Sequence, residues 1–334
     1  MNKKCKILFR TSGGTAKNKE LGLGHIYRTT NLASSFKNCN ISFLIEDYGT
    51  AAAVIESRGF KKISILKKNI SLDLDIKQTL KYIQKNKINI LIVDKYKLKQ
   101  KFVRELKKSI KIVVISDLYN YNYPSNLVFN GFIGFKNQIK LNKYNTNCFL
   151  GPKYQILDSR YSKKINSKKE YDLLATFGGF DENNISQILI NFLIKSSCPL
   201  KIKIILGPAT KKLKNQIKKP NLDIIKQTKN LQKEISKSKF AICSGGITTY
   251  EMANMGINFA ILCQNDHQLI TAKEWEKANL ALNLGKINKN LEKNIEIFLT
   301  KLYRKNISLV TKPSIVDGGG ANRISKEILK LYKP

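Results

Sequence analysis

Short apolar runs alternate with longer amphipathic stretches along the chain. Apolar runs of this length are typical of strands buried on both faces, and the amphipathic stretches are typical of helices that cover a sheet. In the first half, the predicted strands are Cys5–Thr11, Ile41–Glu46, Lys62–Leu66, Ile88–Asp94, Lys111–Asp117 and Leu127–Asn130. Between them, the predicted helices are Tyr27–Phe36, Thr50–Arg58, Asp73–Asn86 and Lys99–Ser109. Repeated strand–helix units predict a parallel sheet.

The second half repeats this alternation after a stretch without clear periodicity. That stretch, from Lys136 to Glu170, contains Gly151-Pro152 and is predicted to join two domains. The predicted strands beyond it are Tyr171–Phe177, Lys201–Gly207, Leu222–Lys226, Phe240–Cys243 and Phe259–Cys263. The predicted helices are Ile185–Lys195, Leu231–Ser238, Thr248–Met255 and Gln268–Asn279.

The pattern therefore predicts two α/β domains. We expect residues 1–150 to form the first and residues 151–334 the second, with the last helix able to pack back on the first. Ligands of such sheets bind outside the carboxyl ends of the strands. Two such sheets facing each other would leave a cleft that fits a nucleotide-sized ligand.

Length and composition are those of an ordinary globular protein. The chain has 334 residues, and 42% of them are hydrophobic, enough for two cores. Its six cysteines form no C-x-x-C pair, so reduced thiols are expected and a metal site is disfavoured. No run of about 18 apolar residues occurs, and the first apolar run is too short for a signal peptide. We expect a cytoplasmic protein without stable membrane insertion.

The formal net charge is +36, which raises the question of a nucleic-acid partner. The excess is nearly all lysine, spread evenly through the chain among Asn and Ile residues, and no arginine-rich or aromatic-interleaved motif accompanies it. This pattern favours solvated surfaces over a nucleic-acid site. The charge could still attract an anionic substrate.

One of the chain's two histidines lies in a glycine-rich turn. Gly22-Leu23-Gly24-His25-Ile26-Tyr27-Arg28 follows the first predicted strand and leads into the first helix. Glycines allow close backbone approach to a ligand, and a helix N-terminus attracts an anion. His25 is therefore a candidate general base, with a structural role as the alternative. Because Tyr27 stands where the dinucleotide fingerprint needs glycine, a nicotinamide enzyme is disfavoured.

Two more glycine turns join strands to helices in the second half. Gly178 and Gly179 follow one strand, and Ser244-Gly245-Gly246 follows another. Their backbone N–H groups could contact a phosphate, although a simple tight turn explains each motif taken singly.

Polar side chains accompany the second of these turns. Helix capping alone explains Thr248 or Thr249. It does not explain Glu251, a carboxylate that can accept hydrogen bonds from the two hydroxyls of a ribose. The turn Asn265-Asp266-His267-Gln268 either caps the next helix or contacts the ligand.

Taken together, these motifs resemble a known family over nearly the whole chain. The matching residues are Phe9-Arg10, Gly22-x-Gly24-His25-x-x-Arg28, Asn31-Leu32-Ala33, Ile92-Val93-Asp94-Lys95-Tyr96, Gly151-Pro152-Lys153-Tyr154-Gln155-Ile156-Leu157, the Gly178 and Gly245 turns, Glu251, Asp266-His267-Gln268 and Asp317-Gly318-Gly319-Gly320-Ala321-Asn322-Arg323-Ile324. The chain resembles the nucleotide-sugar hydrolases of the pseudaminic acid pathway and their spore-coat polysaccharide relatives. These share the two-domain GT-B fold of the MurG-type glycosyltransferases.

The resemblance implies a role for each matching residue. His25 would activate water for attack on the anomeric carbon of a UDP-sugar, with inversion, and Tyr96 would assist in the sugar pocket. Gly22, Gly24 and Arg28 would contact the substrate, while Asp94 would shape its turn or orient a partner. In the second domain, the Gly178–Gly179 and Ser244–Gly246 turns would hold the pyrophosphate, with Thr248, Glu251, His267 and Gln268 also at the nucleotide. Neither a cofactor nor a metal is implied, because helix N-termini and turn amides can stabilise the leaving diphosphate.

The chain departs from the family pattern at three places. The loop Thr15–Leu21 is several residues longer than usual, and the acidic residue that usually follows Arg10 is absent. His267 stands where many members have asparagine, so the phosphate contact of that asparagine would either be made by imidazole or be absent. Lys95 replaces the histidine common before the family's tyrosine, which changes the charge near the sugar.

Three functions remain open from the sequence. The first is hydrolysis of a UDP-activated amino sugar for nonulosonic acid or surface-polysaccharide synthesis. The second is a glycosyltransferase of the same fold, in which His25 deprotonates an acceptor hydroxyl instead of water. The third is a sugar-nucleotide-binding protein without catalysis. The sequence indicates neither the sugar nor the oligomeric state.

Overall fold

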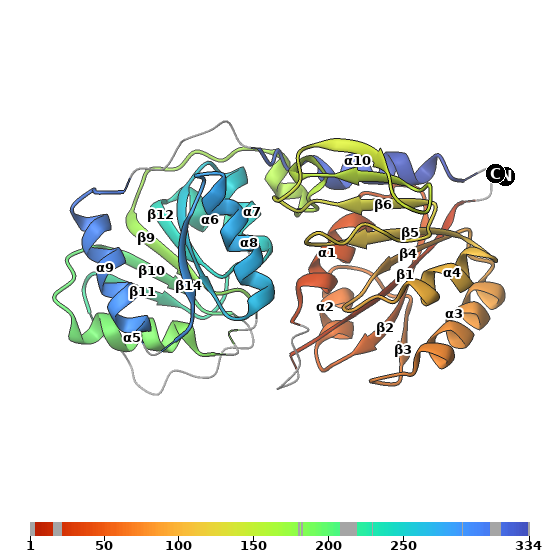
Figure 1. Ribbon diagram of the computed structural model, residues 1–334. Coiled ribbons are helices and arrows are strands. Elements are labelled where there is room, and N and C mark those ends of the chain that lie inside the picture. The colour runs from red at the N-terminus through yellow and green to blue at the C-terminus, as the bar shows by residue number, and fades with distance from the viewer. Residues whose placement is uncertain are drawn as a thin grey trace. The chain divides into compact units, whose positions relative to one another are not determined.

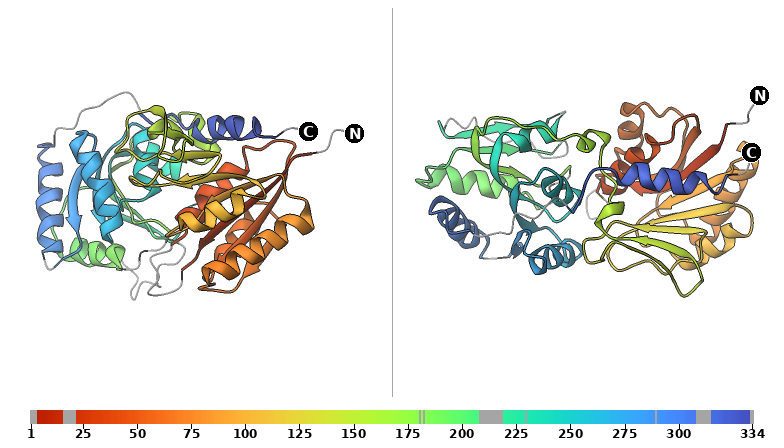
Figure 2. Two further views of the ribbon diagram at one scale, coloured as in Figure 1. Left: turned by 45° about the vertical axis from the view of Figure 1, so that its right-hand side comes forward. Right: turned by 90° about the horizontal axis from the view of Figure 1, so that it is seen from above.

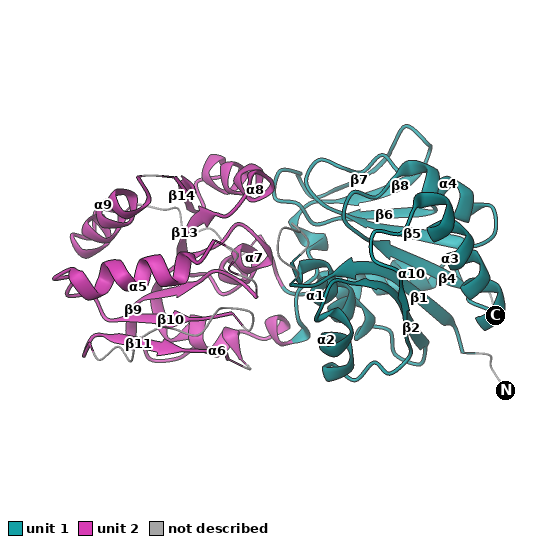
Figure 3. Cartoon of the chain, turned by 90° about the horizontal axis from the view of Figure 1, so that it is seen from below, with its two compact units in different colours: residues 1–159, 318–334 teal, residues 160–317 magenta. Residues whose placement is uncertain are grey.

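The structure is a computed structural model that describes residues 4–15, 22–179, 181, 183–207, 219–228, 230–288, 290–307 and 315–332. The chain divides into two compact units, which Figure 3 colours separately. Unit 1 comprises Met1–Ser159 and Gly318–Pro334, and unit 2 comprises Arg160–Asp317. The C-terminal segment thus belongs with the N-terminal unit.

Unit 1 is built on an eight-stranded sheet in the order β3-β2-β1-β4-β5-β6-β8-β7 (Figure 1). The strands are β1 (Lys6–Gly13), β2 (Asn40–Asp47), β3 (Ile63–Leu66), β4 (Ile90–Asp94), β5 (Lys111–Ser116), β6 (Leu127–Asn130), β7 (Gln138–Leu141) and β8 (Asn147–Leu150). Neighbouring strands are parallel except for the β7–β8 pair. All five residues of β4 are buried, as expected for a central strand covered on both faces.

Helices cover both faces of this sheet. They are α1 (Gly24–Ala33), α2 (Ala51–Ser57), α3 (Leu72–Asn86), α4 (Gln100–Lys107) and α10 (Gly320–Leu329), with the 3₁₀ turn η1 (Pro152–Tyr154). A second 3₁₀ turn, η2 (Ser159–Ser162), contains the residues at which the chain passes from unit 1 to unit 2. Successive side chains of β1 point to opposite faces, so Phe9 packs in the core with α1, α2 and α10, whereas Leu8 packs in the core with α3 and α4. Figure 2 shows α10, in blue, lying along unit 1 in both views. Ile324 and Ile328 of α10 are fully buried there.

Unit 2 has a six-stranded parallel sheet in the order β11-β10-β9-β12-β13-β14. Its strands are β9 (Tyr171–Thr176), β10 (Ile202–Ile205), β11 (Leu222–Ile225), β12 (Ser238–Cys243), β13 (Asn258–Cys263) and β14 (Leu282–Lys286). Its helices are α5 (Ile185–Lys195), α6 (Leu231–Ser236), α7 (Ile247–Asn254), α8 (Asp266–Lys277) and α9 (Leu291–Tyr303). The chain's single tryptophan, Trp275 of α8, is fully buried against Tyr250 and Phe259.

The prediction of two α/β domains with open parallel sheets is confirmed, as is each strand and helix predicted above, with ends shifted by a few residues. The prediction of an irregular stretch from Lys136 was wrong in part, because β7 and β8 extend the first sheet there. These strands are short, and three of the four β7 residues are exposed, so they carry little hydrophobic pattern. The sequence analysis also did not predict β14 or α9.

The two sheets share a strand order that reverses direction at one place. In unit 1 the reversal lies between β1 and β4, and in unit 2 it lies between β9 and β12. Ligands of open α/β sheets bind at such a switch point, outside the carboxyl ends of the strands. Within the described residues, no helix is both long and apolar enough to span a membrane.

Candidate functional site

The switch point of unit 1 joins His25 to a buried carboxylate. His25 lies in the first turn of α1, after β1, and Asp94 is the last residue of β4. His25 Nδ1 lies 2.7 Å from Asp94 Oδ1. The aspartate side chain is fully buried, whereas the histidine side chain remains 15% exposed. One nitrogen of the imidazole thus contacts a buried carboxylate, and part of the ring is exposed to solvent.

Arg28, one helical turn after His25, holds the same carboxylate. Its Nε donates to Asp94 Oδ2 at 2.7 Å and its Nη2 donates to Oδ1 at 2.6 Å. Burial opposes ionisation of Asp94, but the charge of Arg28 and the hydrogen bonds from Arg28 and His25 offset that effect and lower the pKa of the carboxyl. The same pairing raises the pKa of Arg28 against the opposing effect of burial. Asp94 is therefore a fixed anion facing the imidazole.

This anion selects a tautomer of His25. The short contact to Asp94 is satisfied when Nδ1 carries the proton and donates it, and the 3.2 Å approach of Arg28 Nη2 to Nδ1 is then a close contact only. With Nδ1 protonated, Nε2 is left as an acceptor. An imidazole oriented by a carboxylate and presenting Nε2 is the arrangement of a general base.

The turn that follows Asp94 carries Tyr96. This side chain is half-buried, and the ammonium of Lys97 lies 4.9 Å from its ring centroid. Lys95, between Asp94 and Tyr96, forms ion pairs with Glu46 and Asp75. Asp117, after β5, approaches Arg28 Nη2 at 3.5 Å. The catalytic role of Tyr96 stays a prediction.

The glycines predicted in unit 1 lie at the start of α1. A Cβ added at Gly22 or Gly24 would meet nothing within 4 Å, so both positions border open space. The N-cap of α1 is Leu23, whose apolar side chain makes no capping hydrogen bond. Of the predicted loop Thr15–Leu21, residues 16–21 lie outside the described part of the chain. Contacts of Gly22, Gly24 and Arg28 with a substrate stay predictions.

In unit 2, the turns after β9, β12 and β13 are tied together. Gln268 Oε1 accepts hydrogen bonds from the N–H of Gly245 and the N–H of Gln264, at 3.2 and 2.9 Å. Gln264 Nε2 in turn donates to the carbonyl of Phe177, just before Gly178. Gly178 has a left-handed backbone (φ 83°), and a Cβ there would lie 3.5 Å from Ser244 Oγ. The predicted residues of this sheet edge are therefore brought together.

The backbone donors of the Gly245 turn are partly used within the protein. The Gly245 N–H bonds to Gln268 and the Gly246 N–H bonds to the carbonyl of Ser244. What the turn presents instead is the N-terminus of α7, where the N-cap Gly246 makes no side-chain capping bond. A helix N-terminus of this kind favours an anion. Binding of a pyrophosphate here stays a prediction.

The capping explanation for the threonines was wrong. The hydroxyl of Thr249 donates to the carbonyl of Gly246 and accepts from Trp275 Nε1, so it ties α7 to α8. Thr248 is buried at the start of α7 and is not the N-cap. For α8 the capping prediction is confirmed, because Asn265 Oδ1 accepts from the N–H of Gln268.

Glu251 and His267 border the same edge. Glu251 is half-buried in α7, and its negative charge, after burial, contributes to raising the pKa of the Cys243 thiol at the end of β12. His267 is exposed in the first turn of α8. The sequence analysis missed Gln264, although a polar residue directly after a buried strand could have indicated it. Among the described residues, no group of three or more His, Cys, Asp or Glu is placed to hold a metal ion.

Two known proteins are similar in sequence to most of the chain. The chain is 28% identical to an uncharacterized protein of Methanocaldococcus jannaschii over 79% of its own length, and it spans 56% of the length of that relative. It is 25% identical to the spore coat polysaccharide biosynthesis protein SpsG of Bacillus subtilis, over 94% of this chain and 96% of that protein. No family model matches the chain.

Solved structures show the same fold at low sequence identity. The glycotransferase of kitacinnamycin aligns over the whole of both chains with a TM-score of 0.65 and 11% identity. MurG of Acinetobacter baumannii covers 97% of this chain and 99% of its own, with a TM-score of 0.61 and 14% identity. Staphylococcus aureus MnaA in complex with UDP covers 99% of both chains, with a TM-score of 0.59 and 13% identity. The fold is therefore the two-domain GT-B fold.

Proposed function

We propose that the protein acts on a nucleotide-activated sugar and hydrolyses it at the anomeric carbon. The observation that carries the proposal is the His25–Asp94 pair, with its 2.7 Å contact and its bidentate Arg28. A histidine oriented in this way serves to take a proton from an attacking oxygen. The substrate class is supported by similarity to SpsG, named for polysaccharide biosynthesis, and by a structural neighbour solved with UDP.

The proposed reaction uses the residues of each unit for a different task. A water oxygen attacks C1 of the sugar while its proton passes to His25 Nε2. The bond between C1 and the diphosphate oxygen breaks with inversion, and UDP leaves with the electron pair. In unit 2, the N-terminus of α7, which begins after Gly246, would stabilise the leaving diphosphate. The products are UDP and a free amino sugar for nonulosonic acid or surface-polysaccharide synthesis.

A glycosyltransferase is the second candidate, and the fold favours it at least as strongly. The first two solved structures described above are named as a glycotransferase and as MurG. In this alternative, an acceptor hydroxyl takes the place of water and donates its proton to the same Nε2. The roles of Asp94 and Arg28 would be unchanged.

The test is UDP release from a panel of UDP-activated diacetamido and N-acetyl sugars without an acceptor. In H₂¹⁸O, hydrolysis at C1 places the isotope in the free sugar and none in UDP. His25→Gln, which removes the base but keeps a side chain of similar length, is expected to abolish release and to preserve UDP binding. Release that persists in this variant would rule out His25 as the base. Tight UDP-sugar binding without release would favour the transferase.

A further inference from the structure

The turn after β4 contributes neighbouring side chains to two separate charge clusters. Asp94, the last residue of the strand, faces His25 and Arg28. Lys95, the next residue, faces Glu46 and Asp75. Successive side chains at the end of a strand point to opposite faces of the sheet, which explains the division. The second cluster is not part of the proposed reaction.

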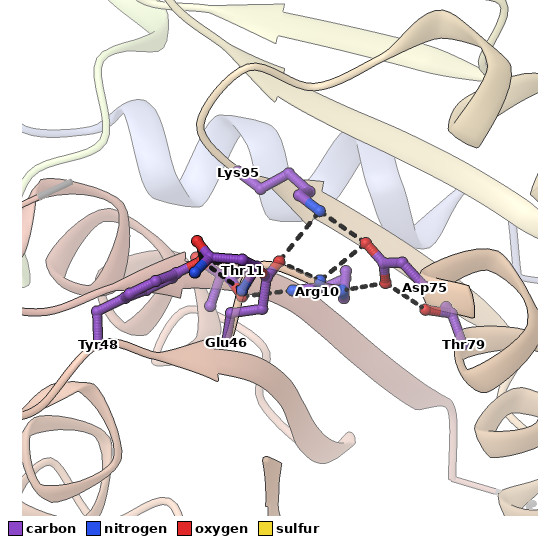
Figure 4. A network of polar contacts seen from close by, with 8 residues as sticks. Arg10, Thr11, Glu46, Tyr48, Asp75, Thr79 and Lys95 are labelled. Carbon is purple, nitrogen blue, oxygen red and sulfur yellow. Dashed lines mark hydrogen bonds and ion pairs between the residues drawn. The ribbon is translucent and has the colours of Figure 1, made fainter. Parts of the chain in front are cut away.

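Arg10 lies at the centre of this second cluster (Figure 4). It comes from β1 and its side chain is fully buried. Its Nε and Nη2 each lie 2.9 Å from an oxygen of Asp75, and Nη2 also lies 2.6 Å from Glu46 Oε1. Lys95 Nζ adds contacts of 2.6 Å to Asp75 Oδ2 and 3.2 Å to Glu46 Oε1.

The cluster is balanced in charge and in hydrogen bonds. Two cations face two carboxylates, and each carboxylate oxygen has a donor, because Tyr48 donates to Glu46 Oε2 and Thr79 donates to Asp75 Oδ1. A buried ion network is stable only when it is satisfied in this way. Without Lys95, Arg10 alone would face two buried carboxylates.

Lys95 differs from the other charged members in where it is attached. Arg10, Glu46 and Asp75 belong to β1, β2 and α3, whereas Lys95 belongs to the turn between β4 and α4. The same turn contains Lys97, a non-glycine residue with a left-handed backbone (φ 51°), a conformation that costs about 1 kcal/mol or more and persists only where the surroundings impose it. The Lys95 ion pairs connect this turn to β2 and α3.

We propose that Lys95 is a positioning residue, whose ion pairs with Glu46 and Asp75 hold the turn after β4 so that Asp94 meets His25 Nδ1 and Tyr96 keeps its place. Lys95 acts through its two neighbours in sequence. The kinetic part of this proposal rests on the proposed function, whereas the geometric part does not.

The test separates positioning from simple charge balance. Lys95→Met leaves one cation, Arg10, facing two buried carboxylates and is expected to destabilise the fold. The informative variant is therefore the double change Lys95→Met with Asp75→Asn, which restores the balance of one cation and one anion. Lys95→Arg keeps the charge and is expected to retain the tether. Lys101→Met is the matched control, because Lys101 forms an exposed ion pair with Asp73.

The first readout is the imidazole of His25, observed by NMR. The chain has only two histidines, so His267→Gln assigns both signals, and Asp94→Asn gives the reference for a lost Nδ1 hydrogen bond. In the folded double variant we expect the Nδ1 proton signal to weaken or move toward that reference. Lys95→Arg and Lys101→Met should leave it in place.

The second readout is the rate of UDP release. Displacement of a catalytic group by about 1 Å can cost about 100-fold, so we expect kcat of the double variant to fall by about 10- to 100-fold with little change in KM. If the double variant does not fold, Glu46→Gln weakens the same tether from its other end and should move the His25 signal in the same direction. If the variant that folds, either the double variant or Glu46→Gln, shows the same His25 Nδ1 signal as the wild type, the proposal is overturned. Absence of UDP release from the wild type would overturn the proposed function alone, since the NMR result would still decide the geometry.

Discussion

The first six strands of each unit have the same order in their sheets, yet the turns at the two switch points are built from different chemical groups. In unit 1 the turns after β1 and β4 supply ionisable side chains, with His25, Asp94 and Arg28 in direct contact. In unit 2 the turns after β9 and β12 supply glycines and hydroxyls, and they are connected through the side-chain amides of Gln264 and Gln268. The same topology thus presents a proton acceptor in one unit and neutral donors in the other.

This difference suggests a division of labour, which variants can test. Groups that move a proton must be fixed by charge, because orientation and protonation state both matter. Groups that hold a polyanion need only present dipoles and N–H groups at close range. Changes in unit 1 should therefore alter kcat, and changes in unit 2 should alter nucleotide affinity.

The largest effect is expected from Asp94→Asn. The amide can donate to Nδ1 and so stabilise the wrong tautomer of His25, with the proton on Nε2. Loss of the orienting aspartate in the Ser-His-Asp triad costs about 10⁴-fold in kcat, and we expect a loss of about 10³- to 10⁴-fold here. Steady-state UDP release measures kcat, and calorimetry should give an unchanged Kd for UDP.

Asp117→Asn is the matched control for that variant. Asp117 also faces Arg28, but at 3.5 Å and with its side chain 34% exposed. Its change should cost less than tenfold in kcat. Equal losses in the two variants would mean that the negative charge around Arg28 matters and the contact with His25 does not.

The next effect is expected in unit 2, from Gly245→Ala. A Cβ there would lie 2.7 Å from the carbonyl oxygen of Gln268, so the turn must move away from α8. Such a shift is expected to weaken UDP binding by about 10- to 100-fold, or about 1.4 to 2.8 kcal/mol, with kcat at saturating substrate little changed. Gly246→Ala meets open space and should cost less. A fall in kcat without a change in Kd would break the proposed division.

The charge pattern of unit 1 could be predicted from the sequence only in part. The position of His25 in a strand-to-helix turn follows from local pattern, and so does the position of Asp94 at a strand end. Their contact does not, because it depends on β1 and β4 being neighbours, a long-range pairing that local periodicity cannot fix.

In unit 2, the linking role of Gln268 is hidden for the same reason. Its local signal was a helix cap, and the cap is present through Asn265. The bond to Gly245, 23 residues away, arises only because β12 and β13 are adjacent. The edge strand β7 could not be predicted for a different reason. Three of its four side chains are exposed, so the strand has little hydrophobic pattern.

A smaller effect is expected from Glu251→Gln. If the carboxylate accepts from the ribose hydroxyls, the wild type should bind UDP about tenfold more tightly than 2′-deoxy-UDP, because a hydrogen bond to a charged group contributes about 1.5 kcal/mol. The variant should lose most of that preference while kcat changes little. If the wild type and Glu251→Gln prefer UDP over 2′-deoxy-UDP by the same factor, Glu251 lies outside the ribose site.

The smallest effect concerns acid stability and compares the units directly. In unit 1, burial opposes ionisation of Glu46 and Asp75, but Arg10 and Lys95 offset it and lower the pKa of each carboxyl below its ordinary value of 4.5 or 3.8. Below those ordinary values the unfolded chain takes up protons before the folded one, so acid favours unfolding. The pKa values of Asp172 and Asp223 in unit 2 are lowered too, against burial, but both side chains are at least 30% exposed and their pairs are screened.

Unit 1 should therefore lose structure at a pH a few tenths of a unit above unit 2. Trp275, the chain's only tryptophan, is buried in unit 2, so its fluorescence reports that unit, whereas far-UV circular dichroism reports both. On acidification the dichroism signal should begin to fall before the fluorescence changes. Asp75→Asn combined with Lys95→Met removes one buried ion pair and should bring the two transitions closer together. Coincident transitions in the wild type would show that the units unfold as one, and the buried charges of unit 1 would then set the acid limit of the whole chain.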